Sequence, residues 1–170
     1  MSKTKRKTFY HKDDEEKPIR AGGVLLYKYV DDSIELLLIT NRGLYEDIGG
    51  CVDNEDKDIY DTVSREVEEE TNEVITYDAI KDRLYDADCV YSKGSKYIIY
   101  IVEATDEEAS HHSDIFGNIE IHDNIKRTIS WIPLKTFLNK DVIKYKLNFR
   151  IKNSYLFNKL KNLPNSVRIV

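Results

Sequence analysis

Cysteine is scarce in this chain, and its scarcity excludes several kinds of protein. Only Cys51 and Cys89 occur among the 170 residues. Two cysteines make neither a disulfide framework nor a cysteine pattern that would bind a metal. We therefore expect the protein to work in a reducing, cytoplasmic environment.

Long apolar segments are also missing. No run of about 18 apolar residues occurs, so neither a transmembrane helix nor a membrane partner is expected. The basic N-terminus is not followed by the apolar stretch of a signal peptide, so secretion is not expected.

The composition is that of one globular domain. The length of 170 residues suffices for one domain but not for two ordinary ones, and 41% hydrophobic residues suit a folded chain. Residues 1–17 are polar and charged and predict a flexible N-terminal tail. Residues 18–163 are predicted to form a single domain that includes a basic C-terminal helix, and no internal repeat is visible.

Charge is distributed unevenly along the chain, although the net charge is only −5. The first residues are basic, and the segment from residue 135 onward carries nine Lys and Arg against one acid, Asp141. The middle of the chain is strongly acidic. Basic flanks beside an acidic centre indicate a polyanionic substrate or RNA, but plain solubility explains them equally well.

The most informative stretch is GGCVDNEDKDIYDTVSREVEEETN, residues 49–72. Glu66, Glu69 and Glu70 are spaced i, i+3 and i+4, so on a helix they share one face. Like charges at this spacing cost about 0.2–0.5 kcal/mol per pair, and carboxylates in a last turn also oppose the helix dipole. A hard divalent cation such as Mg²⁺ would compensate this repulsion, because it prefers oxygen ligands.

The rest of the stretch supports a helix over residues 58–71. Ile59, Val63 and Val67 recur every four residues and form an apolar stripe that would face a sheet. Asp56 or Asp58 is suited to cap the start of the helix. Asn72 tolerates the left-handed backbone conformation that ends many helices.

The stretch resembles the Nudix box, which reads glycine, five residues, glutamate, seven residues, then Arg-Glu-apolar-any-Glu-Glu-any-Gly. The second half matches from Arg65 to Glu70, with Asn72 in place of the final glycine. The first half is one residue too long, because fourteen residues separate Gly50 from Arg65. An insertion in the loop explains this, and leaves either Glu55 or Asp56 in place of the loop glutamate.

The resemblance implies a site that binds Mg²⁺ or Mn²⁺. By this resemblance the metal ligands are the Gly50 carbonyl and the carboxylates of Glu66, Glu69 and Glu70. Arg65 would pair with the loop carboxylate, for which Asp56 is our choice, and so hold the loop to the helix.

The resemblance also implies catalytic and substrate-binding residues. Glu66 and Glu69 are assigned as catalytic, and the general base is either a box glutamate or an acid from a later loop. For that later acid we favour Glu120 over Glu103. Arg42 and Tyr45 are our candidates for substrate binding. Further candidates for contact with substrate are the aromatic residues Tyr91, Tyr97 and Phe116 and the loop histidines His111 and His112.

The family's fold is an α/β/α sandwich with a mixed β-sheet, and the order of elements here agrees with it. Besides the helix over 58–71, the sequence predicts strands, a polar loop, a closing strand that leads into a short helix, and a final helix. These are strands over 19–29, 34–40, 44–48 and 96–103, strand-like stretches near 73–91, the loop over 104–118, the closing segment over 128–138 and the last helix over about 148–161. Phe149, Tyr155, Leu156 and Leu160 are expected to face inward from that last helix.

The function that these features indicate is a metal-dependent pyrophosphohydrolase. Its substrate would contain a nucleoside diphosphate linked to another group: a nucleotide, a dinucleotide or a capped RNA end. The resemblance also leaves a homodimer open. The alternative is a non-catalytic Nudix domain that binds a nucleotide or RNA as a regulatory module.

Overall fold

A computed structural model describes residues 5–138 and 146–163 of the chain. Its centre is a mixed sheet in which the strands lie in the order β12-β5-β4-β3-β8-β7, with β11 paired to β4 and β6 paired to β3. The β3–β8 and β5–β12 pairs are parallel, and the other pairs of this sheet are antiparallel. The strands are β3 (Ala21–Val30), β4 (Ser33–Asn41), β5 (Leu44–Glu46), β6 (Ile48–Cys51), β7 (Asp88–Ser92), β8 (Tyr97–Glu103), β11 (Thr128–Pro133) and β12 (Lys146–Leu147).

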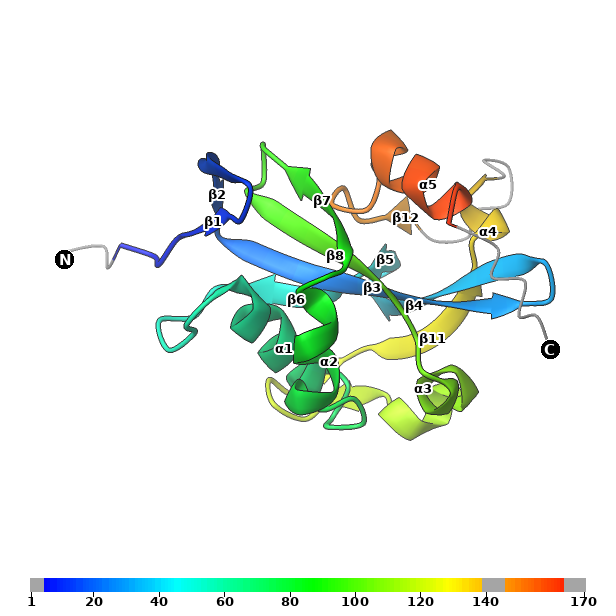
Figure 1. Cartoon of the computed structure of the whole chain (residues 1–170). Helices are drawn as coiled ribbons and strands as arrows, with labels where there is room; N and C mark the ends of the chain where they lie inside the picture. Colours follow the sequence, from blue (N-terminus) through cyan, green and yellow to red (C-terminus); the bar gives the residue numbers. More distant parts are fainter. Residues whose placement is uncertain (1–4, 139–145, 164–170) are drawn as a thin grey trace.

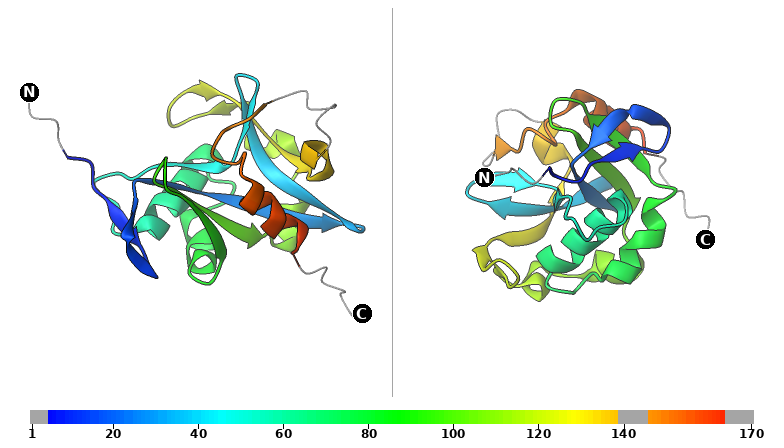
Figure 2. Two further views of the ribbon diagram at one scale, coloured as in Figure 1. Left: turned by 90° about the horizontal axis from the view of Figure 1, so that it is seen from above. Right: turned by 90° about the vertical axis from the view of Figure 1, so that its left-hand side faces the viewer.

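Helices cover both faces of this sheet (Figures 1 and 2). Five helices and a 3₁₀ turn are described: α1 (Ile59–Glu70), α2 (Tyr77–Leu84), α3 (Asp106–Ser110), η1 (Ser113–Phe116), α4 (Lys135–Leu138) and α5 (Ser154–Lys161). Strand side chains alternate between the faces. Val24, Leu26 and Ile98 therefore pack with α1 and α2, whereas Leu25 and Ile99 pack with α4 and α5. The predicted α/β/α sandwich with a mixed sheet is confirmed.

The strands β3 and β6 approach each other unusually closely. A Cβ atom on Gly49 would lie 2.3 Å from the Cα of Gly23, its partner in the ladder. Only glycine fits there, because such a contact is far below the van der Waals distance. The pair of glycines brings the end of β6 against β3 and so fixes where the loop before α1 begins.

For the region near 73–91 the sequence predicts strand-like stretches, which was wrong for much of that region. It contains helix α2, whose first backbone amides are capped by Thr76: the Thr76 hydroxyl accepts a hydrogen bond from the Ala79 amide at 3.2 Å. Ile80 and Leu84 are fully buried against the same core as α1. Their four-residue spacing is helical, and only residues 88–92 form a strand.

The N-terminal segment also differs from its prediction. Residues 1–17 are predicted to be a flexible tail, but the structure shows a two-stranded hairpin of β1 (Phe9–His11) and β2 (Asp14–Ile19). Phe9 pairs with Ile19 across the hairpin, and both side chains contact the core beneath α1. This apolar contact explains why so polar a segment forms regular structure. Residues 1–4 lie outside the described part of the chain.

The last helix is shorter than predicted. It begins at Ser154, where the Asn153 side chain caps it, and not near residue 148. Leu156 and Leu160 are buried as expected, but Phe149 and Tyr155 are 71% and 57% exposed, so their inward orientation was wrong. Residues 139–145 and 164–170 lie outside the described part of the chain, as do three cations of the basic segment, Lys140, Lys144 and Arg168.

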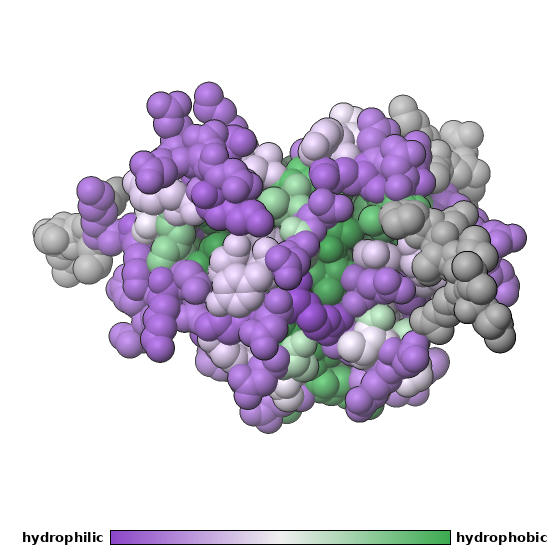
Figure 3. Space-filling model, in the orientation of Figure 1, coloured by the Kyte–Doolittle hydropathy of each residue, from purple (hydrophilic) through white to green (hydrophobic). Residues whose placement is uncertain are grey.

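The predicted polar loop over 104–118 contains α3 and η1, both short. Hydrophilic residues cover most of the face seen in Figure 3, and apolar residues show mainly in the hollow across its middle. Within the described residues, no helix has the length and apolar character needed to cross a membrane.

Candidate active site

Helix α1 carries the conspicuous carboxylates. Asp58 caps its start by accepting a hydrogen bond from the Asp61 amide at 2.7 Å. Ile59, Val63 and Val67 are buried against the sheet, as the apolar stripe predicts. Because one face of the helix is fixed in this way, Glu66 and Glu69 are turned toward the loop that follows β6.

An ion pair joins that loop to the helix. Arg65 donates from Nε to Asp56 Oδ1 at 3.0 Å and from Nη2 to Asp56 Oδ2 at 3.1 Å. The Asp53 amide and the Thr62 hydroxyl also donate to Asp56 Oδ2, each at 2.8 Å. The carboxylate that pairs with Arg65 is therefore Asp56, whereas Glu55 is exposed.

These contacts set the charge of Asp56. Burial alone would raise the pKa of this carboxyl group, but the hydrogen bonds from Arg65, the Asp53 amide and Thr62 lower it below its ordinary value. Asp56 is thus a carboxylate at neutral pH, held in place by four hydrogen bonds from three residues.

The same guanidinium also contacts the helix carboxylates. Arg65 Nη1 lies 2.9 Å from Glu66 Oε1 and 3.3 Å from Glu69 Oε2, and its Nη2 donates to the Cys51 carbonyl at 3.0 Å. One arginine therefore links the loop carboxylate, the loop backbone and two glutamates of α1. This arrangement fixes the spacing between the loop and the helix.

Glu66 lies directly against the end of β6. A Cβ atom on Gly50 would be only 2.4 Å from Glu66 Cδ, so any other residue at position 50 would displace this carboxylate. Burial raises the pKa of Glu66, and the carboxylates of Glu69 and Asp56 add to the rise, while Arg65 opposes it.

Glu70 points the other way, toward the sheet. Its Oε2 accepts a hydrogen bond from the Gly49 amide at 3.0 Å. Its pKa is raised well above the ordinary value, first by burial and then by the nearby carboxylates of Glu66 and Asp47. Asp47 in turn accepts a hydrogen bond from the Tyr97 hydroxyl at 2.6 Å and lies 3.3 Å from Arg150 Nη2.

An open cleft of about 500 Å³ lies beside α1. The structure brings Arg65, Glu66 and Glu69 together on its wall, but Glu70 does not line it. The other residues that line the cleft come from the N-terminal segment, the end of β6 with the loop before α1, and the loop after β9 (Ile119–Glu120): Lys5, Arg6, Cys51, Val52, Asp53, Asn54, His122 and Asp123.

The donor set of this wall suits a hard divalent cation. Glu66 and Glu69 offer carboxylate oxygens, and the Gly50 backbone lies against Glu66. Among the described residues, no three or more His, Cys, Asp or Glu side chains are already grouped as metal ligands. The three glutamates of α1 are apart because Glu66 and Glu69 are bound by Arg65, whereas Glu70 accepts a hydrogen bond from the Gly49 amide. A metal would therefore take over oxygens that Arg65 holds.

The two candidates for a later general base lie in different places. Glu120 is in β9 (Ile119–Glu120), which pairs with β10 (Ile125–Lys126), and its side chain is buried. Its pKa is raised by burial and then by Asp123, and Glu69 also raises it. Glu103 is exposed at the end of β8, in a separate depression next to Lys28 and Asp31.

The predicted substrate-binding residues do not line the cleft. Tyr45 is 8% exposed and lies in the core on the other face of the sheet, where it packs edge-to-face with Phe137 at 5.4 Å between the ring centroids. Burial explains this, because β5 turns Tyr45 toward the core shared with α4 and α5. Arg42, in the turn after β4, lines a different depression together with Asn118 and Lys126.

The other candidates for contact with substrate are also absent from the cleft wall. The His111 ring packs edge-on against Phe116, and His112 is exposed and caps η1. Tyr97 is buried and bound to Asp47, and the Tyr91 hydroxyl donates to the Pro18 carbonyl at 2.8 Å.

Sequence reasoning did not assign several charged residues of the cleft to the site: Lys5, Arg6, Asp53, His122 and Asp123. His122 Nε2 lies 3.9 Å from Glu69 Oε1, and Asp123 is next to it. The sequence of this loop gives no periodic signal. The sequence shows that Lys5 and Arg6 belong to a basic N-terminus. It does not show that they lie in the same cleft as Glu66 and Glu69.

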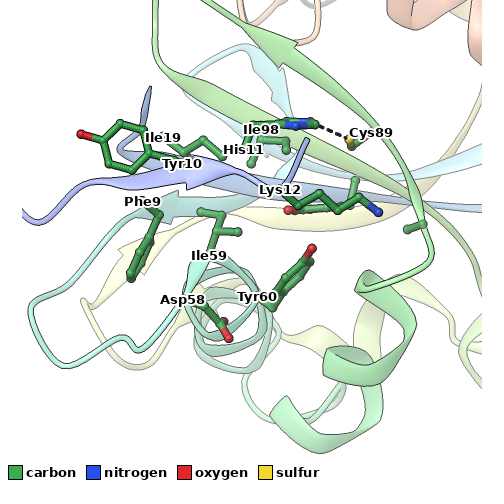
Figure 4. A pocket seen from close by; sticks show the side chains of 12 residues that line it. Phe9, Tyr10, His11, Lys12, Ile19, Asp58, Ile59, Tyr60, Cys89 and Ile98 are labelled. Carbon is green, nitrogen blue, oxygen red and sulfur yellow. Dashed lines mark hydrogen bonds between the residues drawn. The ribbon is translucent and has the colours of Figure 1, made fainter. Parts of the chain in front are cut away.

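A second, smaller cavity of about 150 Å³ lies between the N-terminal hairpin and α1 (Figure 4). Its walls include Phe9, Ile59 and Tyr60, and His11 Nε2 contacts Cys89 Sγ at 3.6 Å. Burial raises the pKa of the Cys89 thiol, so it is the protonated thiol that faces His11.

No protein-family model and no curated protein matches the sequence. Solved structures do match. A C. elegans Ap4A hydrolase, in a binary complex, is 19% identical to this chain, with 84% of this chain and 96% of that chain covered and a TM-score of 0.49. The Nudix domain of Shewanella oneidensis NrtR, in a cocrystal with ADP ribose, is also 19% identical, with 84% and 86% covered and a TM-score of 0.49.

Proposed function

We propose that this chain is a Nudix-type hydrolase that cleaves a diphosphate linkage in a nucleotide-like substrate and depends on a divalent metal. The observation that carries the proposal is the wall of the cleft, where Arg65 joins Asp56 of the loop to Glu66 and Glu69 of α1. The box-like sequence predicts this group of residues, and each of them takes part in a hydrogen bond within the group.

The residues have distinct proposed roles. The Gly50 carbonyl, Glu66, Glu69 and Glu70 would hold Mg²⁺ or Mn²⁺. Such an ion, when bound, neutralises phosphate oxygens and lowers the pKa of a coordinated water. Arg65 and Asp56 position the loop against the helix.

Proton transfer from the attacking water is assigned to a box glutamate or to Glu120. Glu120 is buried near Glu69, and burial and neighbouring carboxylates raise its pKa, which suits a group that accepts a proton. Glu103 is not proposed, because it lies in a separate depression.

The alternative function is that of a binding module without catalysis. One observation favours it: Glu66 and Glu69 are already paired with Arg65, and Glu70 is bound by the Gly49 amide. Such pairing would keep these oxygens from a metal in a domain that only binds its ligand. The intact set of three glutamates favours the enzyme.

Hydrolysis assays separate the two functions. We expect the wild-type protein to release phosphate or nucleotide from members of a panel of nucleotides, dinucleotides and capped RNA, only when Mg²⁺ or Mn²⁺ is present. Glu69→Gln and Glu70→Gln should each lower kcat by at least about a hundredfold, the effect expected when a metal ligand or a proton-transfer group is lost.

Glu55→Gln is the matched control, because Glu55 is an exposed carboxylate in the loop before α1 and does not line the cleft. It should keep the wild-type kcat. A wild-type protein that stays inert over the whole panel, with either metal, would contradict the enzymatic proposal and leave the binding module.

A further inference from the structure

The N-terminal segment just before β1 lies across the loop that precedes α1. Lys7 Nζ donates to the Asn54 carbonyl at 3.3 Å and to the Asp56 carbonyl. Arg20 Nε donates to the Thr8 hydroxyl at 3.3 Å. These contacts fix the path of residues 7 and 8, although they precede the first strand of the hairpin.

The hairpin holds this segment from the other side. Phe9 pairs with Ile19 and contacts the core beneath α1, and Figure 4 shows its side chain next to the start of that helix. Because Phe9 and Lys7 are both held, the residues before them emerge at the cleft. Lys5 and Arg6 accordingly line the same cleft as Glu66 and Glu69.

The cations of the cleft differ in what they bind. Arg65 is engaged by Asp56, Glu66 and Glu69. Lys5 and Arg6, in contrast, form no ion pair with any carboxylate in the described parts of the chain, although Asp53 and Asp123 line the same cleft. Within the described residues the Arg6 side chain makes one weak contact, from its Nη1 to the Cys51 sulfur at 3.9 Å.

The cleft thus has two kinds of wall. One wall carries the carboxylates suited to a divalent cation, and the other carries Lys5 and Arg6, which pair with no carboxylate of the described residues. A substrate with several phosphates would fit both walls: Glu66 and Glu69 would hold a divalent cation that neutralises one phosphate, and Lys5 and Arg6 would bind the neighbouring phosphates directly. Arg and Lys both bind phosphate oxygens through strong, charge-assisted hydrogen bonds.

We infer that Lys5 and Arg6 are substrate-binding residues that contact the phosphates next to the one held at Glu66 and Glu69, so that the cleft selects a polyphosphate chain over a single phosphate. This inference deepens the proposed function, on which its description of the substrate rests. Lys7 is a positioning residue, because it binds the loop carbonyls and holds the two cations at the cleft.

Binding of inorganic tripolyphosphate in the presence of Mg²⁺, measured by calorimetry, tests the inference without any need for hydrolysis. The double variant K5A/R6A should bind tripolyphosphate about tenfold more weakly than wild type, which is about 1.4 kcal/mol. Binding of inorganic orthophosphate should change less than twofold, and the salt dependence of tripolyphosphate binding should become shallower.

The matched control is K152A/K161A, which removes two exposed cations from the C-terminal region. It should bind tripolyphosphate as the wild type does. Thermal unfolding should be unchanged in both double variants, since all four side chains are exposed. Equal weakening in both variants, wild-type affinity in K5A/R6A, or no binding of tripolyphosphate by the wild type would each overturn the inference.

The inference and the proposed function can fail separately. If the wild type hydrolyses nucleotides, K5A/R6A should raise KM and leave kcat unchanged, and an unchanged KM would overturn the inference alone. If no substrate is hydrolysed but tripolyphosphate binding depends on Lys5 and Arg6, the hydrolase proposal fails and the binding role of the two cations stands.

Discussion

Asp61 shows at the scale of one residue how the start of α1 is held. Its Oδ1 is bound by Lys81 and by the Tyr77 hydroxyl, both from α2, and its Oδ2 accepts a hydrogen bond from the Lys57 amide at 2.9 Å. Burial alone would raise the pKa of Asp61, but these bonds lower it to about 2. The carboxylate therefore ties α2 to the first turn of α1.

This shift predicts how stability depends on pH. The pKa of Asp61 is about 2 in the folded protein, below its ordinary value of 3.8, so its stabilisation is complete above pH 4 and is lost as the pH falls toward 2. At pH 6, Asp61→Asn should lower the free energy of unfolding by about 2 kcal/mol. At pH 2 the difference from wild type should nearly vanish, as measured by urea unfolding.

Asp82→Asn is the matched control for this prediction, because Asp82 is an exposed aspartate of α2. It should change the free energy of unfolding by less than about 0.5 kcal/mol at either pH. A loss in Asp61→Asn that is equally large at pH 6 and pH 2 would show that the ion pair is not its cause.

Asn72 matters at the scale of elements, because it both ends α1 and anchors the next part of the site. Its φ of 53° is left-handed, as expected for the residue that follows the helix. Its side chain also donates to the carbonyls of Phe116 and Ile119, at 2.9 and 2.8 Å, and accepts from the Ile121 amide at 2.9 Å. Asn72 thus fixes the strand that carries Glu120 and the loop that carries His122.

Two substitutions separate the roles of Asn72. Asn72→Gly keeps the favourable backbone and removes three hydrogen bonds, so the free energy of unfolding should fall by about 1–3 kcal/mol. Asn72→Ala should cost about 1 kcal/mol more, because alanine tolerates the left-handed conformation poorly. Chemical denaturation measures both. If Asn72→Gly were as stable as the wild type, the hydrogen bonds to residues 116–121 would contribute nothing.

The elements near the box were predictable from the sequence because they depend on local signals. The stripe of Ile59, Val63 and Val67 gave α1 to within one residue at each end. Helix α2 was missed although Ile80 and Leu84 have helical spacing, because with only eight residues it offers few periodic positions. The N-terminal hairpin was missed for a different reason: it is held by Phe9 and Ile19 against a distant core, and local sequence does not show such contacts.

The candidate site was predictable only in part for the same reason. Arg65, Glu66 and Glu69 follow one another on one helix, so their meeting needs no long-range contact. Tyr45 lies in the core and not at the cleft, and the sequence does not show toward which face of the sheet β5 turns its side chain. His122 lies near Glu69, and its neighbour Ile121 is bound to Asn72, a contact between positions 49 residues apart.

At the scale of the whole molecule, one buried charge pair joins the C-terminal region to the sheet beneath the site. The Asp47 side chain is fully buried, and its Oδ1 lies 3.3 Å from Arg150 Nη2 without accepting a hydrogen bond. The Tyr97 hydroxyl binds the other oxygen, and the Arg150 guanidinium lies 4.7 Å from the centroid of the Tyr97 ring. The segment around Arg150 is also bound to β5, where the Asn148 amide donates to the Tyr45 carbonyl at 2.9 Å.

This pair predicts strong energetic coupling between the central sheet, which carries Asp47, and the C-terminal region, which carries Arg150. Arg150→Met would leave Asp47 as a buried carboxyl group without its counter-charge, and should lower the free energy of unfolding by about 3–5 kcal/mol. Asp47→Asn should cost less, since an amide can still accept the hydrogen bond from Tyr97. The double variant should recover part of the loss, because it buries neither charge, with a coupling energy of at least about 1 kcal/mol in a double-mutant cycle. Strictly additive losses would mean that Asp47 and Arg150 stabilise the protein independently, and that the C-terminal segment is held only by its apolar contacts, such as buried Ile151 and Leu156.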